Sequence, residues 1–431
     1  MRFFIALLCA VSMPGLASAN ELLKVYDQAV ENDTQLMAAS AARNAATAGK
    51  SQAFGPLLPQ VNGAGSIGKS SDKYNGNSAV ESDKHSIGLR ASQALFNKQI
   101  WDRWQQSGDR AAAGEAAYRS AEQNLALRVA EAYFNLLSSA DGLRLADAEK
   151  KAIERQLELA KKRFEVGLSA ITDVQEAQAR YDLTVATTIE AEQALSSARE
   201  SLAEITGYSY TSTAVLKDEF PLLGPNPDNI NDWVKSANEG NFTLISARIQ
   251  ADIAKNEIEI SQDGHLPTLS LNGTYGKGAD SNVFSSFEYD STGVSLDLNV
   301  PIFAGGATQA GVRVARSTFE QRQAELEGTR RSVERNTRNA YQGVIAGVAR
   351  VKARKQAVLS NTTALEAAAV GLEVGTRTAV DVLNAQRELY SAQRDYARAR
   401  YDYLLNVLRL KNAAGQLGQK DLAEIDGLLI N

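Results

Sequence analysis

Residues 294–302 have the sequence Val-Ser-Leu-Asp-Leu-Asn-Val-Pro-Ile, in which apolar and polar side chains alternate. A period of two predicts a β-strand with one apolar and one polar face. The run is about 9–10 residues long, which is the length that a tilted strand needs to cross a lipid bilayer. A half-buried strand of a soluble sheet would show the same alternation, so the pattern by itself leaves both interpretations open.

The same pattern occurs earlier in the chain, where Ile87, Leu89 and Ala91 alternate with polar residues. Matching segments lie 208 positions apart along nearly the whole chain: Leu58-Pro59 and Leu266-Pro267, Ala132-Tyr133 and Ala340-Tyr341, and Glu165-Val166-Gly167 and Glu373-Val374-Gly375. One offset held over this distance indicates an internal tandem repeat. We therefore expect two copies of one structural plan, residues 20–212 and residues 213–431.

Each copy predicts a helix, two strands, a long helix and a last helix. The first helix is expected over 21–54, and the strands of each copy are separated by turn-rich stretches, 70–83 and 278–291, which predict exposed loops. The long helices, about 97–165 and 306–373, contain no proline. A helix of this length reaches roughly 100 Å, far more than a globular domain needs.

The last helix of each copy has a seven-residue apolar rhythm, which is typical of coiled-coil packing. Its members are Val174, Tyr181, Thr188, Leu195 and Leu202 in the first copy and Val382, Leu389, Tyr396, Tyr403 and Leu410 in the second. Thr188 is the weak member. Many alanines and charges occupy the other faces, so these helices suit the wall of a water-filled tube better than a compact core.

The first 19 residues predict a secretory signal peptide. Arg2 precedes an apolar run, and Ala17-Ser18-Ala19 is a cleavage site of small residues, so the mature chain is expected to start at Asn20. No later segment has 18 consecutive apolar residues, which excludes a membrane-spanning helix by sequence. The exported protein is therefore either soluble or meets the bilayer as strands.

Composition excludes several other functions. The formal net charge of −5 argues against a nucleic-acid partner, and one Cys with two His argues against a zinc cluster or a disulfide framework. No nucleophile–base arrangement or phosphate-binding glycine loop is visible, so we expect neither enzyme activity nor a cofactor.

Four strands cannot close a barrel, and unpaired strand edges are costly in lipid, so the chain must associate with itself. Two copies would give eight strands, with an interior filled by side chains, and three would give twelve, with room for a passage.

Several longer stretches resemble the TolC family of outer-membrane efflux proteins over nearly the whole mature chain. They are residues 55–60, 163–175, 263–269, 301–306 and 374–383. The resemblance implies an α+β membrane protein: a homotrimer with a twelve-stranded β-barrel in the outer membrane, four strands from each chain, continued by a long helical barrel in the periplasm. It also implies a passive exit duct for efflux, type I secretion or both. Its expected partners are outer-membrane lipid, a periplasmic membrane-fusion adaptor and an inner-membrane pump of the RND, MFS or ABC class.

The resemblance also assigns residues to the periplasmic end of the duct. Asp381 and Asn384 are expected to form rings at its narrowest part. The family commonly has a second Asp at the position of Asn384, so the ring here has three carboxylates in place of six. Gly167, Leu168, Gly375 and Thr376 are expected at the tips that meet the adaptor.

A polar latch is expected to hold this end closed, with Gln156, Thr172, Asp173 and Arg377 matching the family pattern. The pair of Arg377 and Asp173 is the strongest expected tie. Leu372 and Ala369 replace the Tyr and the Glu of the pattern, so fewer ties are expected here than in the family.

The alternative function is that of a soluble periplasmic coiled-coil scaffold or adaptor. Dependence on detergent would distinguish the duct from this alternative. The sequence names neither the cargo nor the particular pump.

Overall fold

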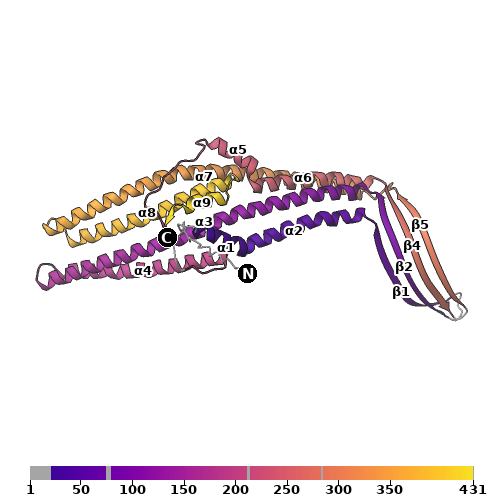
Figure 1. The fold of residues 1–431 in the computed structure, drawn as a ribbon, viewed down its shortest axis with the longest axis horizontal. Coiled ribbons are helices and arrows are strands. Elements are labelled where there is room, and N and C mark those ends of the chain that lie inside the picture. Colours follow the sequence, from indigo (N-terminus) through magenta and orange to yellow (C-terminus); the bar gives the residue numbers. More distant parts are fainter. Residues whose placement is uncertain (1–20, 74–78, 211–213, 283–284, 431) are drawn as a thin grey trace, which may run out of the picture. The chain divides into compact units, whose positions relative to one another are not determined.

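The computed structural model describes residues 21–73, 79–210, 214–282 and 285–430 (Figure 1). The predicted signal peptide, residues 1–19, and the predicted first mature residue, Asn20, lie outside these ranges. The chain forms two compact units. The sheet unit consists of residues 35–121 and 236–335, and the hairpin unit consists of residues up to 34, 122–235 and 336–431. Each unit therefore takes residues from both predicted repeats.

The sheet unit contains a four-stranded antiparallel sheet. Its strands are β1 (Gln60–Asp72), β2 (Val80–Phe96), β4 (Thr268–Asn282) and β5 (Ser286–Asn299), and their order is β1-β2-β4-β5. Figure 1 shows the strands of the first copy beside those of the second. Strands 208 residues apart in sequence are thus joined in one sheet, and β1 and β5 are its two edges.

Helical segments flank these strands in the sequence. They are α2 (Thr34–Phe54), the first part of α3 (Lys98–Glu165), α6 (Phe242–Gln262), the first part of α7 (Ala307–Glu373) and two single turns, Gly55–Leu57 and Asp263–His265. The observed bounds of α3 and α7 agree with the two predicted long helices to within one residue. Buried Gln106 connects two of these helices, because its side-chain amide donates to the carbonyl oxygen of Ile253 on α6 at 3.0 Å.

The strands are longer than the sequence pattern predicted. They have 13, 17, 15 and 14 residues, so half of the predicted loop 70–83 and most of the predicted loop 278–291 are strand. At its other end β5 stops at Asn299, so Val300 and Ile302 of the predicted run lie outside it, because Pro301 has no N–H for strand pairing. The prediction of loops was wrong because it weighed the Gly, Ser, Asn and Asp content alone. In the sheet these polar stretches are tied by cross-strand ion pairs, Lys69–Asp83 at 3.2 Å and Lys84–Asp280 at 3.4 Å.

The two faces of the sheet differ in character near the helices. The pairing register places large apolar side chains on one face, and each of them is more than half exposed: Val61, Ile67, Ile87, Leu89, Val294, Leu296 and Leu298. The opposite face is polar there. On it, Asn272 donates to Asp297 and the hydroxyls of Ser66 and Ser86 are 2.9 Å apart. The predicted apolar and polar faces are confirmed, and the structure leaves the apolar face uncovered.

The hairpin unit is built from two long helical hairpins. The second part of α3 pairs with α4 (Ile171–Thr206), and the second part of α7 pairs with α8 (Ala379–Ala413). The seven-residue rhythm is confirmed as a buried seam: Leu195, Leu202, Val382, Leu389, Tyr403 and Leu410 are all at most 8% exposed. Thr188, the weak member, is 3% exposed because its hydroxyl donates to the carbonyl oxygen of Thr184.

The hairpin unit also contains elements that the repeat did not predict. The first helix of the chain is not continuous over 21–54: it is divided at Asp33 into α1 (Glu21–Asn32) and α2. Buried Asp33 accepts two hydrogen bonds from the guanidinium of Arg128 on α3, at 2.8 and 3.0 Å. Short elements complete the unit: β3 (Val215–Leu216), α9 (Gln419–Asp426) and β6 (Leu429–Ile430), with β3 pairing with β6. The helix α5 (Ile230–Gly240) lies about 208 residues after α1, as the repeat predicts.

Candidate functional site

The two hairpin tips are tight turns around glycine. Gly167 follows α3 and Gly375 follows α7, with φ of 74° and 77°, a conformation that favours glycine. The N–H of Leu168 donates to the carbonyl oxygen of Arg163 at 2.7 Å, and that of Thr376 donates to Gly371 at 2.8 Å. The tips therefore form as the Val-Gly sequences predict. Both present apolar side chains to solvent: Leu168 is 78% exposed, and Val166 and Val374 are each 68% exposed.

An apolar cluster fixes the first hairpin against α8 near the tips. Ile153, Leu157 and Ala160 of α3, Ala177 of α4 and Leu383 of α8 form this cluster, and Val174 and Tyr181 pack against it. Leu383 is the residue before Asn384. The cluster therefore determines which α4 side chains can reach the predicted ring positions on α8.

Asp381 has a structural role that the sequence analysis did not identify. Its carboxylate accepts hydrogen bonds from the backbone N–H and from the hydroxyl of Thr378, both at 2.9 Å, while the N–H of Asp381 donates to that hydroxyl at 3.2 Å. This is a capping box at the start of α8. The backbone and hydroxyl hydrogen bonds, aided by nearby Arg377, lower the pKa of Asp381 below its ordinary 3.8. The Thr-x-x-Asp spacing of residues 378–381 is the sequence signal that would have identified this capping box.

Asn384 is held by a residue that the sequence analysis missed. The guanidinium of Arg180 on α4 donates to its amide oxygen, with Nη2 and Oδ1 3.1 Å apart. The same nitrogen lies 3.7 Å from the carboxylate of Glu176, one turn earlier on α4. No sequence signal identifies this contact, because residues 180 and 384 become neighbours only when the two hairpins pack together.

The predicted latch residues lie near the same end of the hairpin unit but are not joined within one chain. Arg377 and Thr172 are exposed, and Asp173 and Gln156 are half-buried. Among the described residues of a single chain, Arg377 and Asp173 form no ion pair with each other. Leu372 is half-buried just before the second tip. The latch therefore stays a prediction, and it requires a neighbouring copy or a movement of the tips.

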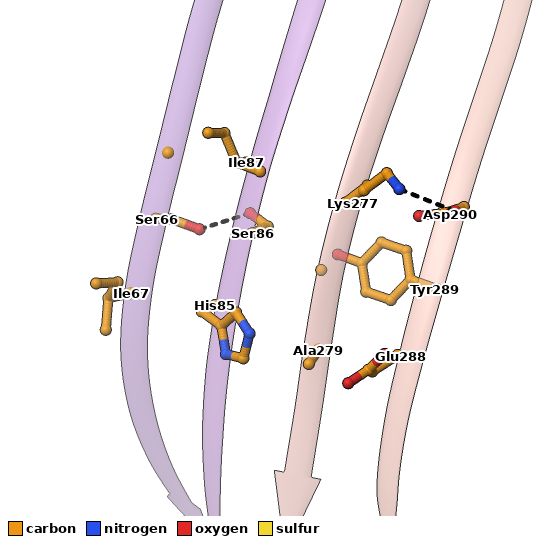
Figure 2. A pocket seen from close by; sticks show the side chains of 12 residues that line it. Ser66, Ile67, His85, Ser86, Ile87, Lys277, Ala279, Glu288, Tyr289 and Asp290 are labelled. Atoms are coloured by element: carbon orange, nitrogen blue, oxygen red, sulfur yellow. Dashed lines mark hydrogen bonds and ion pairs between the residues drawn. The ribbon is translucent and has the colours of Figure 1, made fainter.

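The sheet becomes more polar beyond the middle of its strands. A shallow hollow there is lined by all four strands and includes Ile67 and Ile87, where the apolar face ends (Figure 2). Lys277 pairs with Asp290 across β4 and β5 at 3.4 Å. Gly278 leaves room for the ring of Tyr289, because an added Cβ there would lie 2.7 Å from ring atoms. The apolar face of the sheet thus gives way to charged side chains at this end.

Within the described part of the chain, no group of three or more His, Cys, Asp or Glu side chains could hold a metal ion. Over the same residues, no helix combines the length and the apolar character that a membrane crossing requires.

The fold defines a class of protein: a membrane channel component with long paired helices and a sheet whose exposed apolar face suits lipid. The model of the family described as outer membrane efflux protein matches residues 25–208 and again residues 233–416. The chain therefore belongs to the outer membrane efflux protein family. The two matched spans begin 208 residues apart, which is the offset of the sequence repeat.

Individual relatives agree with this assignment. The chain is 38% identical over 434 residues to the outer membrane protein TolC of Vibrio cholerae, covering 99% of this chain and 98% of that protein. It is 30% identical over 426 residues to the proteases secretion protein PrtF of Dickeya chrysanthemi, covering 95% of this chain and 91% of that protein. The fold matches the crystal structure of the CmeC outer membrane channel of Campylobacter jejuni with a TM-score of 0.79, at 18% identity, over 95% of this chain and 90% of that one.

Family membership confirms the predicted function and location. The protein is an exit duct of the outer membrane, with its helical tunnel in the periplasm. The family is one of efflux channels and not of enzymes.

Proposed function

We propose that three copies of the chain close a twelve-stranded barrel in the outer membrane and continue it as a helical tunnel. The observation that carries this proposal is the sheet itself, which has an exposed apolar face and two open edges, β1 and β5. Open edges are costly in lipid, so another strand must cover each of them. Neighbouring strands of the sheet are antiparallel throughout, so β5 of one copy can pair with β1 of the next in the same antiparallel sense.

The number three follows from the size of the passage. Eight strands, from two copies, enclose an interior that side chains fill, whereas twelve leave room for a channel. Outer-membrane lipid would contact the face formed by Val61, Ile67, Ile87, Leu89 and Val294 to Leu298. The polar face, with Arg90 and Asp297, would line the water-filled passage.

The hairpin tips support a proposal about gating and partners. In a trimer, Asp381 and Asn384 would each form a ring of three at the periplasmic end, and Arg377 of one copy would pair with Asp173 of its neighbour. The exposed tips Gly167-Leu168 and Gly375-Thr376 would dock a periplasmic membrane-fusion adaptor, which opens the duct. The inner-membrane pump would be of the RND, MFS or ABC class, and an ABC exporter accords with the secretion role in the name of PrtF. The duct would have no catalytic activity of its own.

The experiment is a measurement of mass and conductance on the protein purified in detergent. One chain with its signal has a mass of 46.4 kDa. We expect light scattering to give a protein mass about three times that of the mature chain, and planar bilayers to show discrete channels. A monomer that stays monodisperse in buffer without detergent would support the alternative, a soluble periplasmic scaffold, and would overturn the duct.

A further inference from the structure

The proposed narrow end of the duct contains a positively charged side chain, Arg180, that neither the sequence nor the family assignment identified. Arg180 reaches from α4 to Asn384 of α8, with Nη2 of Arg180 3.1 Å from Oδ1 of Asn384. Its side chain keeps 24% of its surface exposed. Asn384 is three residues after Asp381, which places the two on one face of α8.

The packing around Arg180 fixes this position. Ala177 and Tyr181 of α4 belong to the apolar cluster that contacts Leu383, the neighbour of Asn384. Arg180 lies three residues after Ala177 and directly before Tyr181, so α4 cannot turn it away from α8 without disrupting that cluster. Glu176, one turn earlier on α4, forms an ion pair with the same guanidinium nitrogen at the longer distance of 3.7 Å.

The charges at this end alternate along the passage. Asp381 contributes one carboxylate per chain, and Arg180 contributes one guanidinium at the level of Asn384. Further along α8, Arg387 and Glu388 pair with each other at 2.9 Å and cancel locally. An amide cannot neutralise the guanidinium, whereas a carboxylate at position 384 would form an ion pair with it. With Asn384 in this place, the one carboxylate that the described residues of a single chain put near the guanidinium is that of Glu176 at 3.7 Å, so each chain has the Arg180 guanidinium against the carboxylates of Glu176 and Asp381.

We infer that Arg180 is a specificity-determining residue, because its guanidinium ring partly offsets the carboxylates of Asp381 and Glu176 and so weakens the cation selectivity of the duct. The inference rests on the proposed trimeric duct with its Asp381 and Asn384 rings. A charged ring lining a narrow aqueous passage raises the concentration of ions of opposite charge and lowers that of like charge. With the guanidiniums and the carboxylates both present, the two effects oppose each other, so the duct favours cations less than the carboxylates alone would.

The test measures the K⁺/Cl⁻ permeability ratio of single trimers in planar bilayers under a salt gradient. Removing a unit charge at the channel wall changes the concentration of a passing ion by about threefold, so Arg180→Gln is expected to raise the ratio by at least about threefold. Lys151→Gln is the matched control, because it removes the same charge from an exposed position on α3. Its ratio is expected to equal that of the parent.

A double-mutant cycle tests the pairing itself. Asn384→Asp in the parent creates an ion pair with Arg180 and is expected to raise the ratio less than it does in Arg180→Gln, where the new carboxylate is unopposed. Equal effects of Asn384→Asp in the two backgrounds, or an unchanged ratio in conducting Arg180→Gln trimers, would overturn the inference. Parent protein that forms no trimers or no channels would overturn the proposed function instead, and the inference with it.

Discussion

The latch prediction can be tested by replacing Arg377 with Ser. Position 377 matches Ser169 in the first repeat, 208 residues earlier, so Arg377→Ser gives the second tip the residue that the first already has. Arg377 is exposed, and over the described residues it has no ion-pair partner within its own chain, so the substitution leaves no buried charge unpaired. Within its own chain Arg377 only aids the capping box of Asp381, so the larger effect on the closed state is expected from contacts made in the proposed trimer.

The magnitude follows from the exposure of the pair. An ion pair between an exposed Arg and a half-buried Asp contributes about 0.5–1 kcal/mol. A symmetric trimer has three such pairs, so closing is favoured by roughly 1.5–3 kcal/mol in total. Since about 1.4 kcal/mol corresponds to a factor of ten, Arg377→Ser should shift the ratio of closed to open ducts by roughly 10- to 100-fold.

Single-channel recording in planar bilayers provides the assay, and the mean conductance of Arg377→Ser should exceed that of the parent. Lys162→Ser is the control, because it removes a positive charge from an exposed position near the first tip. If the partner is Asp173, then Asp173→Asn should open the duct to a similar degree, and the double variant should add little. Conductance of Arg377→Ser equal to that of the parent would refute the latch.

Three further predictions concern the same end of the protein. Gly371→Ala should raise the conductance as Arg377→Ser does, because the added Cβ would lie 2.6 Å from Cγ of Arg377 and displace that side chain. A conductance equal to that of the parent would show that Arg377 is not held against Gly371. The capping box gives a pH dependence: the lowered pKa of Asp381 means that its stabilising contribution is fully present above pH 3.8 and is lost as pH falls through the lowered value. The unfolding temperature of the detergent-solubilised protein, measured between pH 7 and 3, should therefore show this loss only below about pH 4, and Thr378→Ala should remove it. Leu168→Asp should abolish binding of the cognate adaptor in a pull-down while leaving conductance in bilayers unchanged, since Leu168 is 78% exposed and makes no core contact; unimpaired capture would exclude this tip as the docking site.

The sequence alone determined the elements that depend on local periodicity. Strict alternation around Val294 identified a strand and its faces, the proline-free spans predicted α3 and α7 to within one residue, and Gly167 and Gly375 marked the two tips. The seven-residue rhythm correctly identified the buried seam of α4 and α8. Each of these features follows from side chains that lie within a few turns of one another, so a single chain segment carries the whole signal.

Tertiary structure decided the features that depend on residues distant in sequence. The strands extend into the polar stretches 70–83 and 278–291 because cross-strand ion pairs and backbone pairing outweigh the turn composition. The first helix divides at Asp33 because that carboxylate is buried against Arg128, 95 residues away. The 3.1 Å contact of Arg180 with Asn384 joins residues that are 204 positions apart. Periodicity predicts which face of a helix is buried. It does not predict which side chain of another helix contacts that face, because this depends on how the two hairpins pack together.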